Sequence, residues 1–369
     1  MHILLFSEID PLYSEKNRLH WLLDSLKKHH RVTVVALRDY AKTQQKHTLG
    51  GVLVQYLNEE GVSPARVDQF PWMFTQRFHT LVDINTVDVI VSYNGLGFSA
   101  LLSRVAKRHG IPFCYDLCDD LADLARNSIH VPQVLRPLAG AMARWYLREN
   151  VKAAQHLTVT TPLLLEHFAL TPRAYSVIPN GYFWEEPSQA ISLPAKVPGE
   201  VWIVFIGALR EWVDFSWVLL DMVRWPAHWK LVIAGNEGDL MRIQSEAEKL
   251  GLTGGIHFLG HIPHSALPQL LSQSDVGIIP FRKNATTDMA VPLKLVEYFS
   301  CDLPVVATDM LATKAQFGET VHAIAYGDSW LVALEQALSD DTPTSALVQH
   351  LSWVELGQRF TKAIEATCS

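Results

Sequence analysis

The sequence is poor in cysteine, in charge and in long apolar runs. Its four cysteines among 369 residues are too few and too scattered for a disulfide framework. Cys114 and Cys118 lack a second pair or a nearby set of histidines, which argues against a zinc site. Buried, reduced thiols of this kind are typical of a cytoplasmic protein. No stretch approaches the roughly 18 apolar residues that span a bilayer, and the N-terminus, MHILLFSEIDP, has too short an apolar run for a signal peptide.

Charge is also unevenly distributed along the chain. Residues 1–182 hold 19 Lys and Arg against 16 Asp and Glu, whereas residues 183–369 hold 12 against 22. The acidic second half argues against a nucleic-acid-binding protein, whose surface would be strongly basic. The more basic first half suits an anionic membrane or a phosphorylated acceptor. We therefore expect a cytoplasmic protein, either free or peripheral on the inner face of the cell membrane.

Length and periodicity predict two α/β domains. With roughly one domain per 100–200 residues, two are expected, and buried strands alternate with amphipathic helices, as in parallel, doubly wound sheets. We expect a Rossmann-like domain at 1–182, a linker at 183–200, a second Rossmann-like domain at 201–350 and a C-terminal helix at 351–369 that packs back on the first domain. Such domains bind ligands at the carboxyl ends of their strands, in a cleft where the two sheets face each other.

The expected elements follow one another regularly. Strands of the first domain are expected at His2–Ser7, Val32–Leu37, Val52–Tyr56, Val87–Ser92, Pro112–Tyr115, His156–Thr160 and Ser176–Ile178. Strands of the second are expected at Val201–Ile206, Lys230–Ala234, Ile256–Leu259, Val276–Ile279, Leu303–Thr308 and His322–Ala325. Helices are expected between them, among them Ala41–His47, Phe98–His109 and Pro132–Lys152.

One stretch of the second domain, Asp288–Met310, predicts a binding site. It reads DMAVPLKLVEYFSCDLPVVATDM, a loop, a short helix, a break and a buried strand. Pro292 suits the first turn of the helix, where its missing N–H costs nothing. Lys294 in that turn favours a diphosphate at the helix N-terminus, and Glu297, on the same face, can accept hydrogen bonds from ribose hydroxyls. The alternative is an amphipathic helix with a solvated Lys–Glu pair.

A second motif fits a dinucleotide-binding fingerprint. Residues 95–100, GLGFSA, match G-x-G-x-x-A after a strand, and Asp116 lies about 20 residues on, where a ribose carboxylate is expected. The motif is not in the first βαβ unit, however, and no hydride-transfer site can be assembled downstream. Tight packing of a helix against a strand is the better explanation of these glycines.

Six segments, in order, resemble a GT-B glycosyltransferase of the large family-4-like group. They are VIPNGY at 177–182, FIGAL at 205–209, LVIAGNEGD at 231–239, IHFLGHIP at 256–263, SDVGIIPF at 274–281 and the stretch Asp288–Met310. The resemblance implies that the second domain binds a nucleotide-sugar donor. The donor-binding residues it implies are Gly207, Arg210, His261, Ile262, Asp288, Pro292, Leu293, Lys294 and Glu297.

The chain departs from the commoner family pattern at two places. Of the family's two acids eight residues apart, Glu297 matches the second, but Met289 stands where the first is expected, with Asp288 one residue away. GALREWVDF replaces the usual G-R-L-x-x-x-K-G segment, so Arg210 becomes a candidate cation and Lys294 resembles a substitute for the missing lysine. These features resemble a subgroup that includes glucuronosyltransferases of bacterial exopolysaccharide and teichuronic acid assembly. The resemblance implies an inverting mechanism with a carboxylate base in the first domain.

Candidates for that base lie in YDLCDDL at 115–121. Asp119 is the first choice, Asp120 the second and Asp116 the third, because the strand would bury Asp116. Neighbouring carboxylates raise each other's pKa, which suits a base, although a helix N-terminus rich in acids is the alternative explanation. Weaker, acceptor-side candidates are Arg18, His20, Tyr93 and Asn94. The aromatic segment Phe70–Phe78 is either local packing or a lipid-facing patch.

The resemblance thus implies a glycosyltransferase that moves a hexosyl or glucuronosyl group from a nucleotide diphosphate sugar to a glycan or lipid-linked acceptor. We expect a UDP-sugar as donor, no metal ion, no cofactor and no nucleic-acid partner. Two alternatives are a sugar-nucleotide epimerase of the same fold and a non-catalytic sugar-nucleotide-binding partner of an assembly complex.

Overall fold

The computed structural model describes residues 1–12, 16–38, 48–128, 131–185, 193–235 and 238–368. The chain forms two compact units, one of residues 1–179 with 353–369 and one of residues 180–352. The sequence placed the corresponding boundaries at 182 and 351. The expected helix Ala41–His47 lies outside the described residues.

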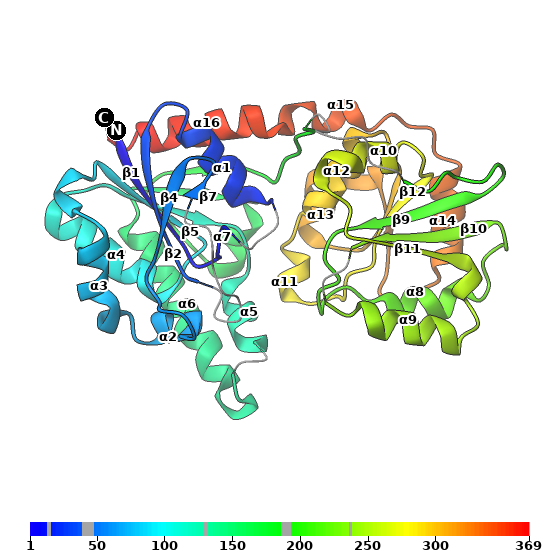
Figure 1. Ribbon diagram of the computed structural model, residues 1–369, viewed down its shortest axis with the longest axis horizontal. Helices are drawn as coiled ribbons and strands as arrows, with labels where there is room; N and C mark the ends of the chain where they lie inside the picture. The colour runs from blue at the N-terminus through cyan, green and yellow to red at the C-terminus, as the bar shows by residue number, and fades with distance from the viewer. Residues whose placement is uncertain (13–15, 39–47, 129–130, 186–192, 236–237, 369) are drawn as a thin grey trace. The chain divides into compact units, whose positions relative to one another are not determined.

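The first unit is an α/β layer structure around one sheet (Figure 1). Its strand order is β3-β4-β2-β1-β5-β6-β7-β8, and every described pair is parallel except β3 with β4. The strands are β1 (His2–Ser7), β2 (Arg31–Ala36), β3 (Thr48–Leu49), β4 (Val52–Tyr56), β5 (Val89–Tyr93), β6 (Phe113–Leu117), β7 (His156–Val159) and β8 (Tyr175–Val177). Strands β1, β5 and β6 are buried along their whole length, as expected for a sheet covered on both faces.

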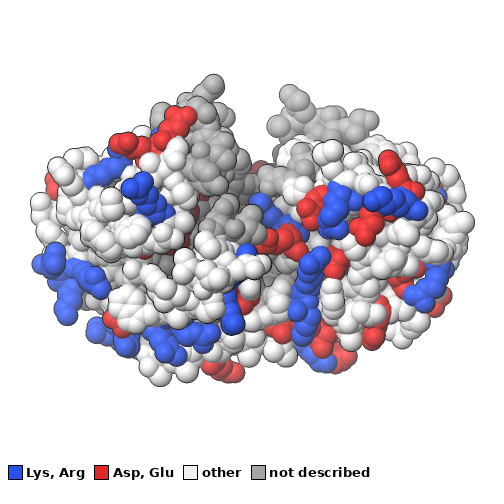
Figure 2. All heavy atoms as spheres, turned by 90° about the horizontal axis from the view of Figure 1, so that it is seen from below, with Lys and Arg blue, Asp and Glu red and all other residues white. Residues whose placement is uncertain are grey.

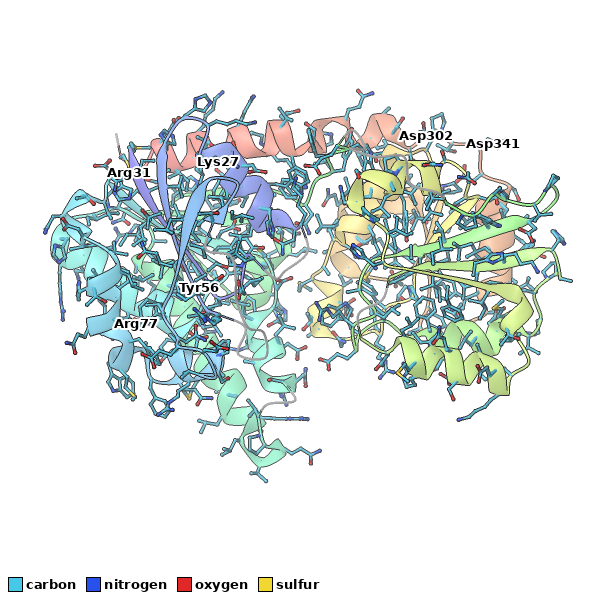
Figure 3. The ribbon with its side chains drawn as sticks, viewed as in Figure 1. Lys27, Arg31, Tyr56, Arg77, Asp302 and Asp341 are labelled. Atoms are coloured by element: carbon cyan, nitrogen blue, oxygen red, sulfur yellow. The ribbon has the colours of Figure 1, made fainter. Side chains whose placement is uncertain are left out.

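Helices of the first unit cover its sheet. They are α1 (Arg18–Leu26), α2 (Pro64–Gln69), α3 (Thr75–Leu81), α4 (Gly97–His109), α5 (Leu121–Asn127), α6 (Arg136–Ala153), α7 (Leu163–Phe168) and α16 (Trp353–Glu365), with 3₁₀ turns η1 (Pro71–Phe74), η2 (Ile84–Thr86) and η3 (Gln133–Leu135). The C-terminal helix α16 packs on α1, where the Ser25 and Thr361 hydroxyls lie 3.0 Å apart. Trp353 and Phe360 of this helix are buried. Arg77 of α3 donates from Nε to the Tyr56 carbonyl at the end of β4 (Figure 3).

The second unit repeats the architecture with a parallel sheet of order β11-β10-β9-β12-β13-β14. Its strands are β9 (Val201–Ile206), β10 (Trp229–Ala234), β11 (Ile256–Gly260), β12 (Val276–Ile279), β13 (Val305–Thr308) and β14 (Val321–Ile324). Its helices are α8 (Phe215–Met222), α9 (Leu240–Lys249), α10 (Leu267–Leu271), α11 (Ala285–Asp288), α12 (Leu293–Ser300), α13 (Leu311–Phe317), α14 (Trp330–Leu338) and α15 (Ser345–Val348), with 3₁₀ turns η4 (Thr253–Gly255), η5 (His264–Ala266), η6 (Gly318–Thr320) and η7 (Gln349–Leu351). Close packing holds α12 on the sheet, because a Cβ on Gly277 of β12 would lie 2.6 Å from the Tyr298 ring.

The predicted strands are confirmed, with ends shifted by a few residues. The long helix expected from Pro132 is wrong at its start, since a 3₁₀ turn, η3, precedes α6 and the helix begins at Arg136. In the Phe70–Phe78 segment, Phe78 is fully buried, as local packing predicts, whereas Phe70 and Trp72 are exposed. A lipid-facing patch there stays a prediction.

A buried ion pair ties the end of β6 to α1. One edge of the Arg18 guanidinium meets both carboxylate oxygens of Asp116, with Nε 3.0 Å from Oδ2 and Nη2 2.8 Å from Oδ1, and the two side chains are 3% and 0% exposed. The Nη1 group also donates to the Ile178 carbonyl at 2.6 Å. One side chain therefore joins the first helix, the sixth strand and the last segment of residues 1–179.

Arg18→Met should lower the free energy of unfolding by about 3–5 kcal/mol, because it leaves the Asp116 carboxylate buried without its cation. Chemical denaturation of this variant and of the double variant with Asp116→Leu measures the free energy of unfolding. Arg18→Met combined with Asp116→Leu should recover most of the loss, since no uncompensated buried charge is left. A single variant as stable as the wild type would contradict the account.

Candidate functional site

The second unit has a topological switch point at its centre. Strand β9 pairs with β10 on one side and with β12 on the other, so the loops after β9 and β12 leave the carboxyl edge in opposite directions, which is where such sheets bind ligands. Gly207, the first residue after β9, has φ +103°. A Cβ on the facing Gly235 would lie 2.1 Å from the Gly207 carbonyl oxygen, so both turns need glycine to approach each other.

The predicted helix begins beside this turn. Pro292 is the N-cap of α12 and Leu293 its first residue, one position later than the sequence suggested. Asn180 of the VIPNGY segment donates from Nδ2 to the Val291 carbonyl at 2.9 Å, which fixes the chain just before the helix.

Lys294, in the first turn of α12, reaches the switch point. Its Nζ lies 3.6 Å from the centre of the Phe205 ring and 5.5 Å from that of Phe281, and a Cβ on Gly207 would be 3.5 Å from it. Burial lowers the pKa of Lys294 to about 7, against the opposing charge of Glu297. The solvated Lys–Glu pair is therefore wrong: the ammonium is held against aromatic faces at the carboxyl edge of the sheet, where an anion would favour its charged form.

Glu297 belongs to a closed set of contacts. The Nε2 of His264 lies 3.0 Å from its Oε1, and the His264 ring stacks on Trp184 with centroids 5.2 Å apart. Trp184 donates from Nε1 to the Ser300 hydroxyl at 3.0 Å, and that hydroxyl donates to the Glu297 carbonyl at 2.7 Å. The carboxylate is thus oriented through one oxygen by a histidine that is itself held in place.

The other predicted donor-side residues differ in their exposure. Arg210 and His261 are exposed and Ile262 is half-buried. Asp288 pairs with Lys283 at 2.5 Å, and Met289 is 8% exposed, so its apolar side chain is buried where the family has an acid.

The loops after β9 and β12 also bind each other. Asp214 donates its N–H to the Pro280 carbonyl at 2.7 Å, and Arg282 donates its own to Trp212 at 2.8 Å. The Asp214 carboxylate lies 3.4 Å from Arg282 Nε and accepts from the Tyr326 hydroxyl. In this chain, GALREWVDF therefore braces the switch point.

In the first unit, Asp119 lies just beyond the carboxyl end of β6. Asn94, which follows β5 with φ +47°, donates from Nδ2 to Asp119 Oδ2 at 2.9 Å. Its Oδ1 accepts from the Cys118 N–H at 2.9 Å, so both ends of one amide hold the turn. Burial raises the pKa of Asp119, while the Asn94 hydrogen bond lowers it. The carboxyl is half-buried and is the more accessible of the two predicted bases.

Asp120 is committed to the local fold. It is buried, caps α5 by accepting from the Asp123 N–H at 2.8 Å, and lies 2.8 Å from His167 Nε2. A side chain held by a cap and a histidine has less freedom to take a proton from a substrate.

Three acceptor-side candidates are buried in the first unit. Arg18 binds Asp116, as described above. The His20 ring lies 2.8 Å from the Pro11 carbonyl and completes a capping box with Asn17, and burial lowers its pKa. Tyr93 is buried, and burial raises its pKa well above the usual range. Their contact with an acceptor stays a prediction, as does that of Asn94.

The glycine fingerprint at 95–100 is filled by protein groups. Asp68 of α2 accepts from the Gly97 and Phe98 N–H groups at 2.8 and 3.1 Å, and Glu8 accepts from that of Leu96. A Cβ on Gly97 would lie 2.1 Å from the Asp68 carbonyl oxygen. The first turn of α4 thus binds carboxylates of its own chain. Gly97 does serve tight packing, but against helix α2 and not against a strand as expected.

Sequence reasoning missed Trp184, Phe205 and His264 as parts of the donor-side site. His264 carries a usable signal, since it directly follows the GHIP segment. Trp184 and Phe205 carry none, because their roles depend on tertiary contacts. Within the described part of the chain, no three His, Cys, Asp or Glu side chains group as a metal site would require, and no helix there is long and apolar enough to cross a membrane.

Lys294→Met should raise the unfolding midpoint at pH 7, because it removes an ammonium whose burial disfavours its charged form. The wild type should gain stability relative to this variant as the pH rises from about 7 toward the usual 10.5, since in that window the unfolded state binds the proton that the folded state lacks. Thermal unfolding across this pH range measures both effects. Lys249→Met, at an exposed site of α9, is the control and should show neither. An equal response of both variants would contradict the burial of Lys294.

Comparisons with known proteins match both units. Residues 16–181 match the family model "Glycosyl transferase 4-like domain", and residues 200–340 match "Glycosyl transferases group 1". A 2-deoxystreptamine glucosyltransferase from Streptomyces kanamyceticus is 22% identical over 206 residues, 52% of each chain. The putative teichuronic acid biosynthesis glycosyltransferase TuaH from Bacillus subtilis is 27% identical over 143 residues, 37% of this chain and 34% of TuaH. The chain therefore matches only about a third to a half of the length of these curated relatives.

Among solved structures, HepE from Anabaena in complex with UDP superposes with a TM-score of 0.68 at 15% identity, over 99% of this chain and 100% of HepE. At that identity the likeness establishes the fold, which agrees with the two parallel-sheet units described above. The chain is therefore a GT-B protein in which a glycosyl transferase 4-like domain precedes a group 1 glycosyl transferase domain.

Proposed function

We propose that the protein transfers a sugar from a nucleotide diphosphate sugar, a UDP-sugar, to a glycan or lipid-linked acceptor at the inner face of the cell membrane. The observation that carries the proposal is the position of Lys294, half-buried against the Phe205 ring beside the Gly207 turn at the start of α12. A cation and free helix N–H groups at a switch point suit a diphosphate. UDP is bound by HepE, which shares the fold.

In the proposed reaction the anomeric carbon exchanges its bond to the diphosphate oxygen for a bond to an acceptor hydroxyl oxygen. Lys294 and the N-terminus of α12 stabilise the negative charge that stays on the departing diphosphate. Glu297, oriented by His264, accepts hydrogen bonds from the ribose hydroxyls. Asp119 takes the proton from the acceptor hydroxyl, for which its raised pKa suits it. These roles need no metal ion and no cofactor, and they correspond to inversion at the anomeric carbon.

The likeness to TuaH, weak as it is, favours an acceptor in cell-envelope polysaccharide assembly and a glucuronosyl or hexosyl group as cargo. The epimerase and the non-catalytic binding partner are distinguished from this proposal by one comparison. An epimerase turns over the donor without an acceptor, whereas a binding partner takes up UDP-sugar and releases no UDP when membrane extract supplies acceptors.

Asp119→Asn should lower the rate of UDP release with membrane extract by about 10²–10⁴-fold while leaving UDP-sugar affinity unchanged, because the base contacts the acceptor and not the nucleotide. Steady-state kinetics and titration calorimetry measure the two effects. Asp123→Asn, which changes a half-buried carboxyl in the first turn of the following helix α5, is the matched control. Equal activities of the two variants would remove Asp119 from the mechanism.

His264→Leu should weaken UDP binding by about tenfold, the loss of one hydrogen bond to a charged group, and should abolish most of the preference for UDP over 2′,3′-dideoxy-UDP. His264→Gln, which can still donate to Glu297, should retain that preference. Calorimetric titration with both nucleotides measures it. A histidine that served only the fold would lower both affinities equally.

A further inference from the structure

Helix α6 of the first unit presents an apolar stripe to solvent. Leu138, Met142 and Trp145 recur at helical spacing, and 58%, 38% and 49% of their surfaces are exposed. The opposite side of the helix is buried through Gly140, Ala143 and Leu147. The stripe spans about 10 Å along the helix axis. A surface helix of a globular protein turns its apolar face inward, so this outward stripe requires an explanation.

A second apolar group lies in the same region of the first unit. Trp72 and Met73 of η1 are 63% and 55% exposed, and η1 packs with α2 on α4, which in turn packs on α6. Tyr146, the neighbour of Trp145, is half-buried. Burial raises its pKa, on which the charges of Asp68 in α2 and Arg104 in α4 also act. The exposed residues of η1 and of α6 thus lie on elements that pack against the same helix, α4.

The charge around these groups is strongly positive. Helices α4 and α6 together carry seven Lys and Arg against one Glu. On α4, Arg104, Lys107 and Arg108 form the exposed side. On α6, Arg144 and Arg148 are both exposed, and the Arg144 guanidinium lies 5.5 Å from the centre of the Phe168 ring of α7. Figure 2 shows Lys and Arg along the border of a largely uncharged surface over the first unit, with few Asp and Glu there.

We propose that this α4–α6 face, formed by the exposed residues of α4, η1 and α6, docks on an anionic phospholipid bilayer. Exposed tryptophans next to a leucine and a methionine suit insertion among acyl chains at the interface, while neighbouring arginines contact lipid phosphates. A second copy of the chain would bring two positive faces together, which disfavours self-association. The inference names the surface for the membrane contact that the proposed function assumes, and it does not depend on donor binding.

Sedimentation with lipid vesicles tests the proposal on the full chain. The protein should pellet with vesicles of phosphatidylcholine and phosphatidylglycerol, and much less with phosphatidylcholine alone or at high salt. Arg144→Gln combined with Arg148→Gln should weaken binding by at least about tenfold, since each cation near such a surface contributes about one kcal/mol. Trp145→Ser should weaken it comparably.

Leu220→Ser and Lys249→Gln, both at exposed positions of the second unit, are matched controls and should bind like the wild type. All variants should keep the wild-type unfolding midpoint and UDP affinity, so failure of this inference is distinguishable from failure of the proposed function. Wild-type protein that stays in the supernatant with anionic vesicles would overturn the proposal. Equal losses in the control variants, or a concentration-dependent dimer that Trp145→Ser abolishes, would overturn it as well.

Discussion

The contact between the Lys294 ammonium and the Phe205 ring is the interaction on which the donor-side site depends. The lysine lies 3.6 Å from the ring centre because three local constraints coincide. Glycine at 207 leaves room after β9, Asn180 holds the chain before α12, and Tyr298 packs the same helix onto Gly277. A charge held this way is costly to the empty protein and useful to an anionic ligand, which is the usual compromise between stability and function.

In both units, loops at the carboxyl edge of the sheet hold one another in place and position polar side chains, but the side chains differ. In the second unit the loops after β9 and β12 brace each other and carry a cation with an oriented carboxylate. In the first unit the loop after β5 supplies Asn94, whose left-handed backbone aims its amide at the turn that bears Asp119. Of its neighbours, Asp116 forms an ion pair with Arg18, and Asp120 caps α5. Of the three carboxyl groups, only that of Asp119 is half-buried, and it accepts a hydrogen bond from the neutral amide of Asn94.

Periodicity and motif order predicted both sheets and the start of α12, because buried strands and helix N-terminal residues carry local signals. The same signals predicted Lys294 and Glu297 as neighbours on one face. They could not predict that the Lys294 ammonium lies against the Phe205 ring, that His264 reaches Glu297 across 33 positions, or that Asp68 accepts hydrogen bonds at the N-terminus of α4. Those contacts depend on which loops the strand order brings together. Helix α2, which carries Asp68, is also too short to show a helical periodicity in the sequence. The outward stripe of α6 was missed because spacing identifies an apolar side of a helix without saying whether protein covers it.

The most direct test of the account is an NMR titration of Lys294, whose side-chain signals are assigned with the Lys294→Met variant. In the free protein the account predicts a pKa of about 7. Saturating UDP should move that pKa upward, because a bound diphosphate favours the ammonium form. A pKa near 10.5 that UDP leaves unchanged would contradict the central claim that this half-buried lysine is the cation for the donor diphosphate.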